Sequence, residues 1–154
     1  MDEEQRAFDQ SLRLLTRRDH SVAELRRKLA LRGYAPATVE TVLDRLTRLG
    51  YLDDRRFATL WAEAALRGGK GVGPRLRQEL QRRGVASELI AETLEQLASE
   101  HDEHQVLADL VARRFAGFDP VRADDRERRR VYGFLQRRGF SLSTILEFFR
   151  TISG

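Results

Sequence analysis

Apolar residues recur along this chain in a pattern that repeats three times around a glycine. Gly33, Gly84 and Gly139 lie 51 and 55 residues apart, and apolar residues occupy the same five positions around each of them. These positions precede the glycine by eight (Leu25, Leu76, Val131) and four residues (Leu29, Leu80, Leu135) and follow it by six (Val39, Ile90, Ile145), ten (Leu43, Leu94, Phe149) and thirteen (Leu46, Leu97, Ile152). Matched columns of this kind indicate an internal repeat of about 50 residues.

The spacing within each copy predicts two helices that are separated by a turn at the glycine. Residues four apart lie on the same helix face, so the positions before the glycine form one apolar stripe and those after it form another. The glycine supplies the left-handed conformation that ends the first of these helices. A further apolar stretch precedes each pair: Phe8, Leu12 and Leu15; Phe57, Leu60, Trp61 and Ala64; Val106, Leu107, Leu110 and Val111.

Local signals support this interpretation and set the fold class. Ser21 with Glu24 three residues later is a capping box, and Pro36 and Pro74 suit the first turn of a helix. Glycine-bearing linkers fall at residues 66–74 and 116–120, and no alternating strand pattern competes. We therefore predict an all-α fold of three tandem three-helix, helix-turn-helix-like repeats, at residues 1–50, 51–99 and 100–154. Because each unit is too small to bury much alone, we expect the repeats to stack into an elongated, curved array.

The composition excludes several classes of protein. The chain of 154 residues has no cysteine, which excludes disulfides, thiolate zinc sites and cysteine nucleophiles. No apolar run approaches the roughly 18 residues of a membrane span, and the acidic start MDEEQ is unlike a signal peptide. We expect a cytoplasmic protein with no membrane partner.

No arrangement of residues indicates an enzyme. His101 and His104 could share a helix face, but no third metal ligand lies nearby. The segment GGKGVG lacks the Lys-Ser/Thr ending of a phosphate-binding loop and follows a helix rather than a strand. We therefore expect no catalytic residue, no metal and no cofactor.

The basic residues are concentrated in the second helix of each repeat. Lys and Arg number 28 against 24 acidic residues, and all but Lys28 and Lys70 are arginine, a bias for which codon usage in a GC-rich genome is an open alternative. Residues 17–32 carry a net charge of +4, residues 67–83 of +5 and residues 122–138 of +4. Such recurrence favours a basic face that binds phosphates or acidic protein patches. The candidate residues are Arg26, Arg27, Lys28, Arg32, Lys70, Arg75, Arg77, Arg82, Arg83, Arg128, Arg129, Arg130, Arg137 and Arg138.

Several segments resemble the RecX family over residues 10–152. They are RRDHSVAELRRKL (17–29), GYLDDRRFA (50–58), GKGVGPRLRQEL (69–80), RRGV (82–85) and FLQRRGFSLSTILEFF (134–149). The resemblance implies three tandem three-helix repeats. It also implies a regulator that binds the RecA–single-stranded DNA filament and inhibits its ATP hydrolysis, strand exchange and co-protease activity. The third repeat matches less well, with Tyr132 and Gly133 inside its second helix.

Two hypotheses for the partner follow. The first is the RecA filament, with direct contact to single- or double-stranded DNA left open. The alternative is a sequence-specific DNA-binding protein of the helix-turn-helix type, although the arginines cluster at helix C-termini and recognition helices read bases from their N-terminal parts. We expect a monomer, because an array of stacked repeats needs no second copy.

Overall fold

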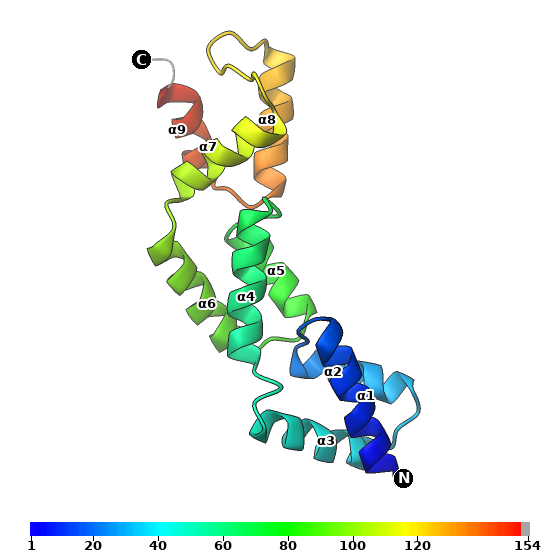
Figure 1. Ribbon diagram of the computed structural model, residues 1–154. Helices are drawn as coiled ribbons and strands as arrows, with labels where there is room; N and C mark the ends of the chain where they lie inside the picture. Colours follow the sequence, from blue (N-terminus) through cyan, green and yellow to red (C-terminus); the bar gives the residue numbers. More distant parts are fainter. Residues whose placement is uncertain (152–154) are drawn as a thin grey trace. The chain divides into compact units, whose positions relative to one another are not determined.

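In the computed structural model, residues 1–151 are described, and they form nine α-helices and no strand (Figure 1). The helices are α1 (Glu3–Arg17), α2 (Val22–Leu31), α3 (Pro36–Arg48), α4 (Asp54–Arg67), α5 (Pro74–Arg82), α6 (Ser87–Glu100), α7 (Glu103–Arg114), α8 (Asp125–Arg137) and α9 (Leu142–Thr151). This confirms the all-α prediction, with three helices for each copy of the sequence repeat.

The chain divides into two compact units. Unit 1 consists of Met1–Leu60 and Glu79–Ile90, and unit 2 of Trp61–Gln78 and Ala91–Gly154. Helices α4, α5 and α6 therefore contribute residues to both units. Each unit has its own cluster of buried apolar side chains.

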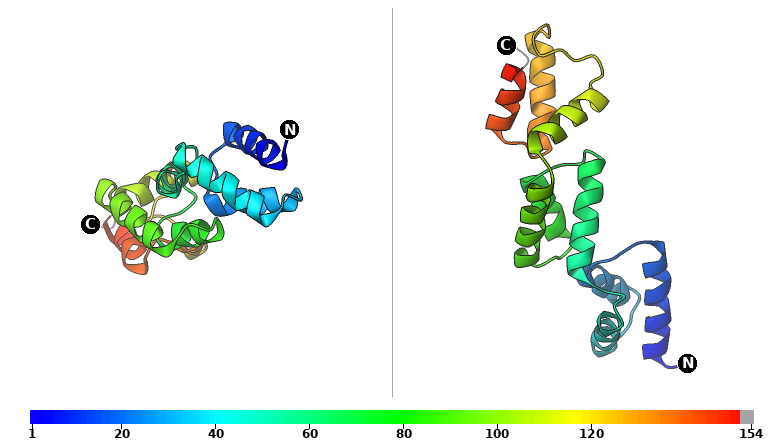
Figure 2. Two further views of the ribbon diagram at one scale, coloured as in Figure 1. Left: turned by 90° about the horizontal axis from the view of Figure 1, so that it is seen from below. Right: turned by 60° about the vertical axis from the view of Figure 1, so that its left-hand side comes forward.

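The core of unit 1 lies between α1, α2 and α3 (Figure 2). Helix α1 packs against both α3 and α2, and α2 packs against α3. Leu25 and Leu29 of α2 are completely buried, as is Leu46 of α3. Burial of each such leucine stabilises the fold by about 1.5–3 kcal/mol.

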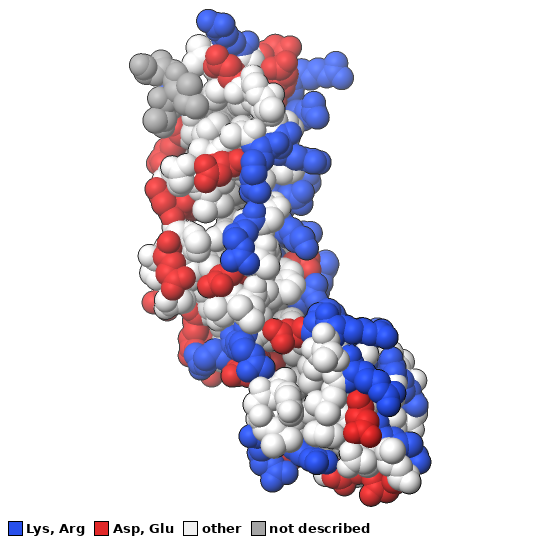
Figure 3. All heavy atoms as spheres, viewed as in Figure 1, with Lys and Arg blue, Asp and Glu red and all other residues white. Residues whose placement is uncertain are grey.

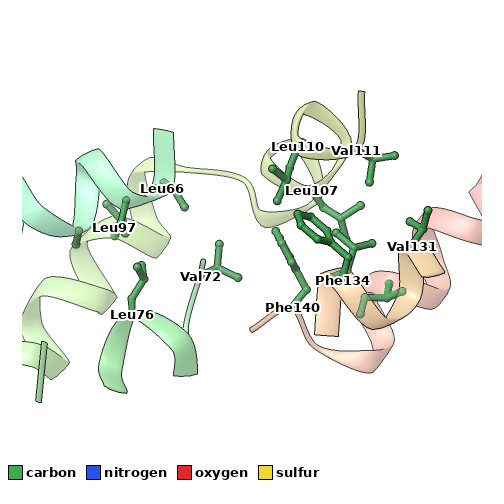
Figure 4. Packing of buried hydrophobic residues seen from close by; sticks show 14 residues of the cluster. Leu66, Val72, Leu76, Leu97, Leu107, Leu110, Val111, Val131, Phe134 and Phe140 are labelled. Atoms are coloured by element: carbon green, nitrogen blue, oxygen red, sulfur yellow. The ribbon is translucent and has the colours of Figure 1, made fainter. Parts of the chain in front are cut away.

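The core of unit 2 joins residues of α4 to α6 with residues of α7 to α9. Figure 4 shows Leu66, Val72, Leu76 and Leu97 on one side of this cluster and Leu107, Leu110, Val111, Val131, Phe134 and Phe140 on the other. Phe134 meets the Phe115 ring edge to face, with centroids 5.1 Å apart. Helix α9 packs against α7 and α8, and it runs beside α8 in both Figure 1 and Figure 2.

The repeat columns are confirmed wherever the structure describes them. Every column residue is buried except Leu94 and Phe149, which are partly buried and pack against the core of unit 2, and Ile152, which lies outside the described residues. Gly33, Gly84 and Gly139 adopt positive φ angles of 89°, 80° and 98°, in the left-handed region that only glycine enters at little cost. The predicted turn glycines therefore end α2, α5 and α8.

The predicted starts of α2, α3 and α5 are also confirmed. Ser21 and Glu24 form the two hydrogen bonds of a capping box, and Pro36 and Pro74 are the first residues of α3 and α5. The loop before α8 is longer than the predicted linker at 116–120, because α7 ends at Arg114 and α8 begins at Asp125.

The apolar stripe predicted for α4 is only partly confirmed: Phe57 is buried and Trp61 packs against the core of unit 2, but Leu60 and Ala64 are not on the buried side. Leu60 is 48% exposed and Ala64 is exposed, whereas the buried side is formed by Phe57, Ala58, Ala62, Ala65 and Leu66. Alanines at 58, 62 and 65 follow the spacing of one helix face. These small side chains are almost completely buried, while the bulkier Leu60 stays at the surface.

The orientation of α4 makes Leu60 replaceable. Leu60→Gln is expected to change the free energy of unfolding by less than about 0.5 kcal/mol, because the side chain gives up little buried area. Urea unfolding followed by circular dichroism measures this difference. A loss above about 1.5 kcal/mol would instead place Leu60 in a core contact.

Candidate interaction surface

Most of the predicted basic residues lie on α2, α5 and α8, and the others directly follow these helices or, for Lys70, lie in the loop before α5. The structure separates them by their partners. Arg26 forms an ion pair with Glu40, with Nε 2.7 Å from Oε1, and Arg82 pairs with Glu79 at 3.3 Å. The Arg26 pair joins two half-exposed side chains, so it contributes little to stability. It nevertheless directs the Arg26 guanidinium towards α3.

Four more of these residues make contacts within the protein. The Arg83 guanidinium lies 3.4 Å from the Glu24 carboxylate, and the Lys28 ammonium lies 2.8 Å from Nε2 of His20. Arg130 lies over the Phe115 ring and Arg138 over the Phe134 ring, at 5.4 and 4.7 Å from the ring centroids. Cation–π contacts of this kind hold an arginine in place without neutralising its charge.

The remaining candidates differ in exposure. Arg128 donates a hydrogen bond to the Val121 carbonyl at 3.2 Å, and Arg75 is half-buried. The side chains of six others are exposed and make no hydrogen bond or ion pair within residues 1–151: Arg27, Arg32, Lys70, Arg77, Arg129 and Arg137. These six are the cations that an external partner could engage without breaking an internal contact.

In unit 1, the N-terminus of α2 meets the C-terminal end of α5. The Ser21 hydroxyl accepts a hydrogen bond from the Glu24 N–H at 3.0 Å and donates its own proton to the Arg83 carbonyl. The Val22 N–H donates to Oδ1 of Asp54 at 2.9 Å. The capping box predicted from the sequence is therefore also a tertiary contact, since Ser21 joins residues 62 positions apart.

A groove of about 620 Å³ opens at this junction. It is lined by Ala23, Glu24, Arg27, Lys28 and Leu31 of α2 and by Glu79, Arg82, Arg83 and Gly84 at the end of α5. The structure thus brings together candidates from the first two basic clusters, whereas Arg26 and Arg32 do not line this groove. Leu31 is 77% exposed and adds an apolar side chain to a basic rim.

The two carboxylates in the groove leave a net positive charge. Burial raises the pKa of the Glu24 carboxyl, but hydrogen bonds from the Arg18 guanidinium and the Ser21 N–H outweigh it and hold that pKa below its usual value. Glu24 therefore stays ionised and keeps Arg18 and Arg83 in place. Arg27 has no such counter-ion and is the groove cation most available to a ligand.

His20, which precedes Ser21, joins the loop before α2 to Lys28 of that helix. Its side chain is buried, with Nδ1 3.0 Å from the Arg18 carbonyl and Nε2 2.8 Å from the Lys28 ammonium. The neutral ring satisfies both contacts, with Nδ1–H as donor and Nε2 as acceptor. Burial, with the positive charges of Arg18 and Lys28, lowers the pKa of His20 below its ordinary value of 6.5, although the hydrogen bond to Arg18 opposes this.

This histidine gives the stability of the fold a defined pH dependence. Because the pKa of His20 is lower in the folded protein, the unfolded chain takes up the proton first as pH falls. The contribution of neutral His20 to the free energy of unfolding is therefore fully present above pH 6.5 and is lost as pH drops below that value. We expect the melting temperature to fall between pH 7 and pH 5.5, and His20→Gln to flatten that fall. Thermal unfolding followed by circular dichroism at each pH measures both, and an equal fall in the variant would exclude His20 as the cause.

In unit 2, the loop before α5 meets the C-terminal end of α8. The Val72 N–H donates a hydrogen bond to the Arg138 carbonyl at 2.8 Å. A Cβ atom added at Gly139 would lie 3.1 Å from Cβ of Arg75. Candidates from the second and third basic clusters therefore meet at this corner, and Figure 3 shows Lys and Arg side chains gathered along the side of α5.

Sequence reasoning missed the residues that build these two junctions. Ser21 was found as a helix cap, but not as a donor to Arg83, and the contact of Asp54 with the start of α2 was not foreseen. The signal was present in the repeat alignment, because Ser21 and Val72 both lie twelve residues before a turn glycine. Both positions donate a hydrogen bond to the carbonyl of the residue just before a turn glycine, Ser21 through its hydroxyl and Val72 through its backbone N–H.

Among residues 1–151, no three His, Asp or Glu side chains gather where they could hold a metal ion, and Nε2 of His104 lies 3.2 Å from Glu147. None of the helices described there is both long and apolar enough to cross a membrane.

Three family models match the chain in sequence order. They are the first three-helix domain of RecX at residues 7–46, the second at residues 53–94 and the third at residues 101–149. Their residue ranges follow the three copies of the sequence repeat and cover most of the chain.

Full-length relatives match closely. The regulatory protein RecX of Trichlorobacter lovleyi is 47% identical over 139 residues, which cover 90% of each chain. The regulatory protein RecX of Syntrophotalea carbinolica is 37% identical over 143 residues, which cover 93% of this chain and 94% of that protein.

Solved structures have the same fold. The crystal structure of RecX from Lactobacillus salivarius superposes with a TM-score of 0.79 over 99% of this chain and 97% of that one, at 15% identity. A crystal structure of regulatory protein RecX gives a TM-score of 0.80 over 97% of this chain and 74% of that one, at 21% identity. Repeat pattern, helix order, domain matches and relatives agree, and the chain belongs to the RecX family of regulatory proteins.

Proposed function

We propose that this protein binds the RecA–single-stranded DNA filament and inhibits its ATP hydrolysis, strand exchange and co-protease activity, acting as a regulator rather than an enzyme. The observation that carries the proposal is the succession of three RecX domains across residues 7–149, together with relatives that are named regulatory protein RecX. RecA is proposed as the partner because the resemblance to the RecX family implies it. The same proposal has the protein act as a monomer in the cytoplasm, where RecA filaments form.

The basic groove of unit 1 is the proposed contact surface. Arg27 and Arg82 are exposed at its rim, and guanidinium groups form paired hydrogen bonds with carboxylates and phosphates alike. Filament protomers offer carboxylates and the bound DNA offers phosphates, so both are ligands of suitable charge. Binding that favours one arrangement of neighbouring protomers opposes the motions needed for hydrolysis and strand exchange.

The deciding experiment measures ATP hydrolysis by RecA on single-stranded DNA, with this protein added well below the RecA concentration. Suppression at such ratios is expected, because one bound molecule would affect many protomers of a filament. Unchanged hydrolysis, with a sample whose helical circular dichroism shows it to be folded, would remove the proposed function. A RecA variant that cannot form filaments serves as the control for direct inhibition of single protomers.

Sequence-specific DNA binding is the alternative, and the local geometry of α2 disfavours it. A recognition helix reads base edges with its N-terminal residues. Here the N-terminus of α2 is covered by the end of α5, with Ser21 completely buried, and its first turn carries the acidic Glu24. Binding to one duplex sequence about 10³-fold more tightly than to bulk duplex would restore this alternative.

A further inference from the structure

We infer that Gly84 and Gly139 are positioning residues: each locks one RecX domain onto the domain before it, and the two locks fix the spacing of the basic side chains. This inference rests on the proposed function only for its inhibition readout. The first lock lies wholly within unit 1 and the second wholly within unit 2.

The first lock joins the end of α5 to the start of α2. The Arg83 carbonyl accepts a hydrogen bond from the Ser21 hydroxyl, and the Arg83 guanidinium pairs with Glu24 at 3.4 Å. A Cβ atom added at Gly84 would overlap the methyl group of Ala23. The absence of a side chain at Gly84 is therefore what allows the end of α5 to come this close to α2.

The second lock joins equivalent positions of the next two domains through a backbone donor. The Arg138 carbonyl accepts a hydrogen bond from the Val72 N–H at 2.8 Å. A Cβ atom added at Gly139 would overlap the Val72 carbonyl oxygen and lie 3.1 Å from Cβ of Arg75. In both locks the acceptor is the carbonyl of the residue just before the turn glycine. The donor belongs to the preceding repeat and lies twelve residues before the turn glycine of that repeat.

Gly33 shows that the lock is separate from the turn. It has the same positive φ as the other two glycines, but no atom lies within 4 Å of a Cβ placed there. Gly33 belongs to the first domain, which has no matched domain before it. The left-handed turn thus needs glycine at all three positions, whereas close packing needs it only at Gly84 and Gly139.

The consequence for binding concerns where the cations lie. The first lock puts Arg82 and Arg83 around the same groove as Arg27 and Lys28, and the second puts Arg75 beside Gly139, the residue after Arg138. A substitution that disrupts a lock would leave every positive charge in the chain and change only the distances between the basic side chains on its two sides. Gly84 therefore acts through the arginines rather than by touching the partner.

The test compares Gly84→Ala with Gly33→Ala, which carries the same backbone strain without the overlap. Gly33→Ala should melt about 2–8 °C below the parent because of the left-handed alanine, and Gly84→Ala should melt lower still because of the overlap with Ala23. Gly84→Ala should in addition raise the half-inhibitory concentration for RecA hydrolysis at least about tenfold, while Gly33→Ala leaves it within about twofold. Ala23→Gly in the Gly84→Ala background removes the obstructing methyl and should restore the inhibition.

A second readout does not involve RecA. The chain has no cysteine, so Leu31→Cys and Gln81→Cys, both at exposed positions of unit 1, allow two spin labels to be attached without a competing thiol. The electron–electron distance should be narrowly distributed in the parent and in Gly33→Ala, broad in Gly84→Ala, and narrow again when Ala23→Gly is added. If the parent protein does not inhibit RecA, the proposed function fails while these distances still decide the inference.

Two results would overturn the inference. One is Gly84→Ala with the distances and melting temperature of Gly33→Ala. The other is failure of Ala23→Gly to restore them, which would mean that the overlap with Ala23 is not the cause. If Gly84→Ala does not fold alone, recovery of a folded protein by Ala23→Gly supports the lock, and no recovery refutes it.

Discussion

Reversing the charges of Arg27 and Arg82 together should raise the half-inhibitory concentration for RecA hydrolysis at least about tenfold while leaving the fold intact. Both guanidinium groups are exposed at the rim of the unit 1 groove. The double variant Arg27→Glu/Arg82→Glu would repel carboxylates and phosphates where the parent attracts them. The cost to folding is small, because Arg27 has no internal partner in the described chain and Arg82 pairs only with Glu79 at the surface.

The matched control reverses two exposed cations of the same unit that lie away from the groove. Arg13 of α1 and Arg48 of α3 are exposed and make no ion pair among residues 1–151, so Arg13→Glu/Arg48→Glu changes the net charge by the same amount. Loss of inhibition in the groove variant alone would assign the contact to the groove. Equal losses in both would mean that net charge matters and the groove does not, and full activity of the groove variant would exclude the groove.

The helices could be predicted because their determinants are local. Each apolar column and each turn glycine acts within one or two helical turns, so three copies of the pattern gave the element order and most of the core. Helix α4 is the exception, since Leu60 and Ala64 on one side and Ala58, Ala62 and Ala65 on the other are all apolar. Periodicity cannot choose between two apolar faces, and only the tertiary structure shows that the alanine face is the buried one.

The interaction surface was only partly predictable because charge is visible in a sequence and its partner is not. Arg26 and Glu40 are 14 residues apart, and Arg83 and Glu24 are 59 residues apart. Arg27 sits next to Arg26 in the chain yet faces the groove without a counter-ion. The repeat boundaries at 1–50, 51–99 and 100–154, the elongated array and the roles of the basic residues stay predictions.

Ser21→Ala should lower the free energy of unfolding by about 2–4 kcal/mol, more than the loss of a helix cap alone. The Ser21 hydroxyl caps α2 by accepting from the Glu24 N–H, and a lost serine cap costs about 0.5–2 kcal/mol. The same hydroxyl donates to the Arg83 carbonyl, which is left without this donor beside a fully buried position. A buried carbonyl that loses its partner costs about 1–3 kcal/mol more.

Two further substitutions separate the cap from the tertiary contact, with urea unfolding as the measurement. Ser141, which precedes α9, is exposed; its hydroxyl accepts from the Thr144 N–H at 3.2 Å and hydrogen-bonds the Thr144 hydroxyl at 2.8 Å, both within the first turn of α9. Ser141→Ala therefore removes a cap whose hydroxyl makes no hydrogen bond to another helix of the described chain, and it should cost about 0.5–2 kcal/mol. Ser21→Asp keeps a strong cap acceptor but has no proton to donate and faces the Arg83 carbonyl with a negative charge, so it should be as destabilising as Ser21→Ala. A Ser21→Asp variant as stable as the parent would show that the hydroxyl matters only as a cap. In that case the contact between α2 and α5 depends on the Gly84–Ala23 approach and the Arg83–Glu24 ion pair.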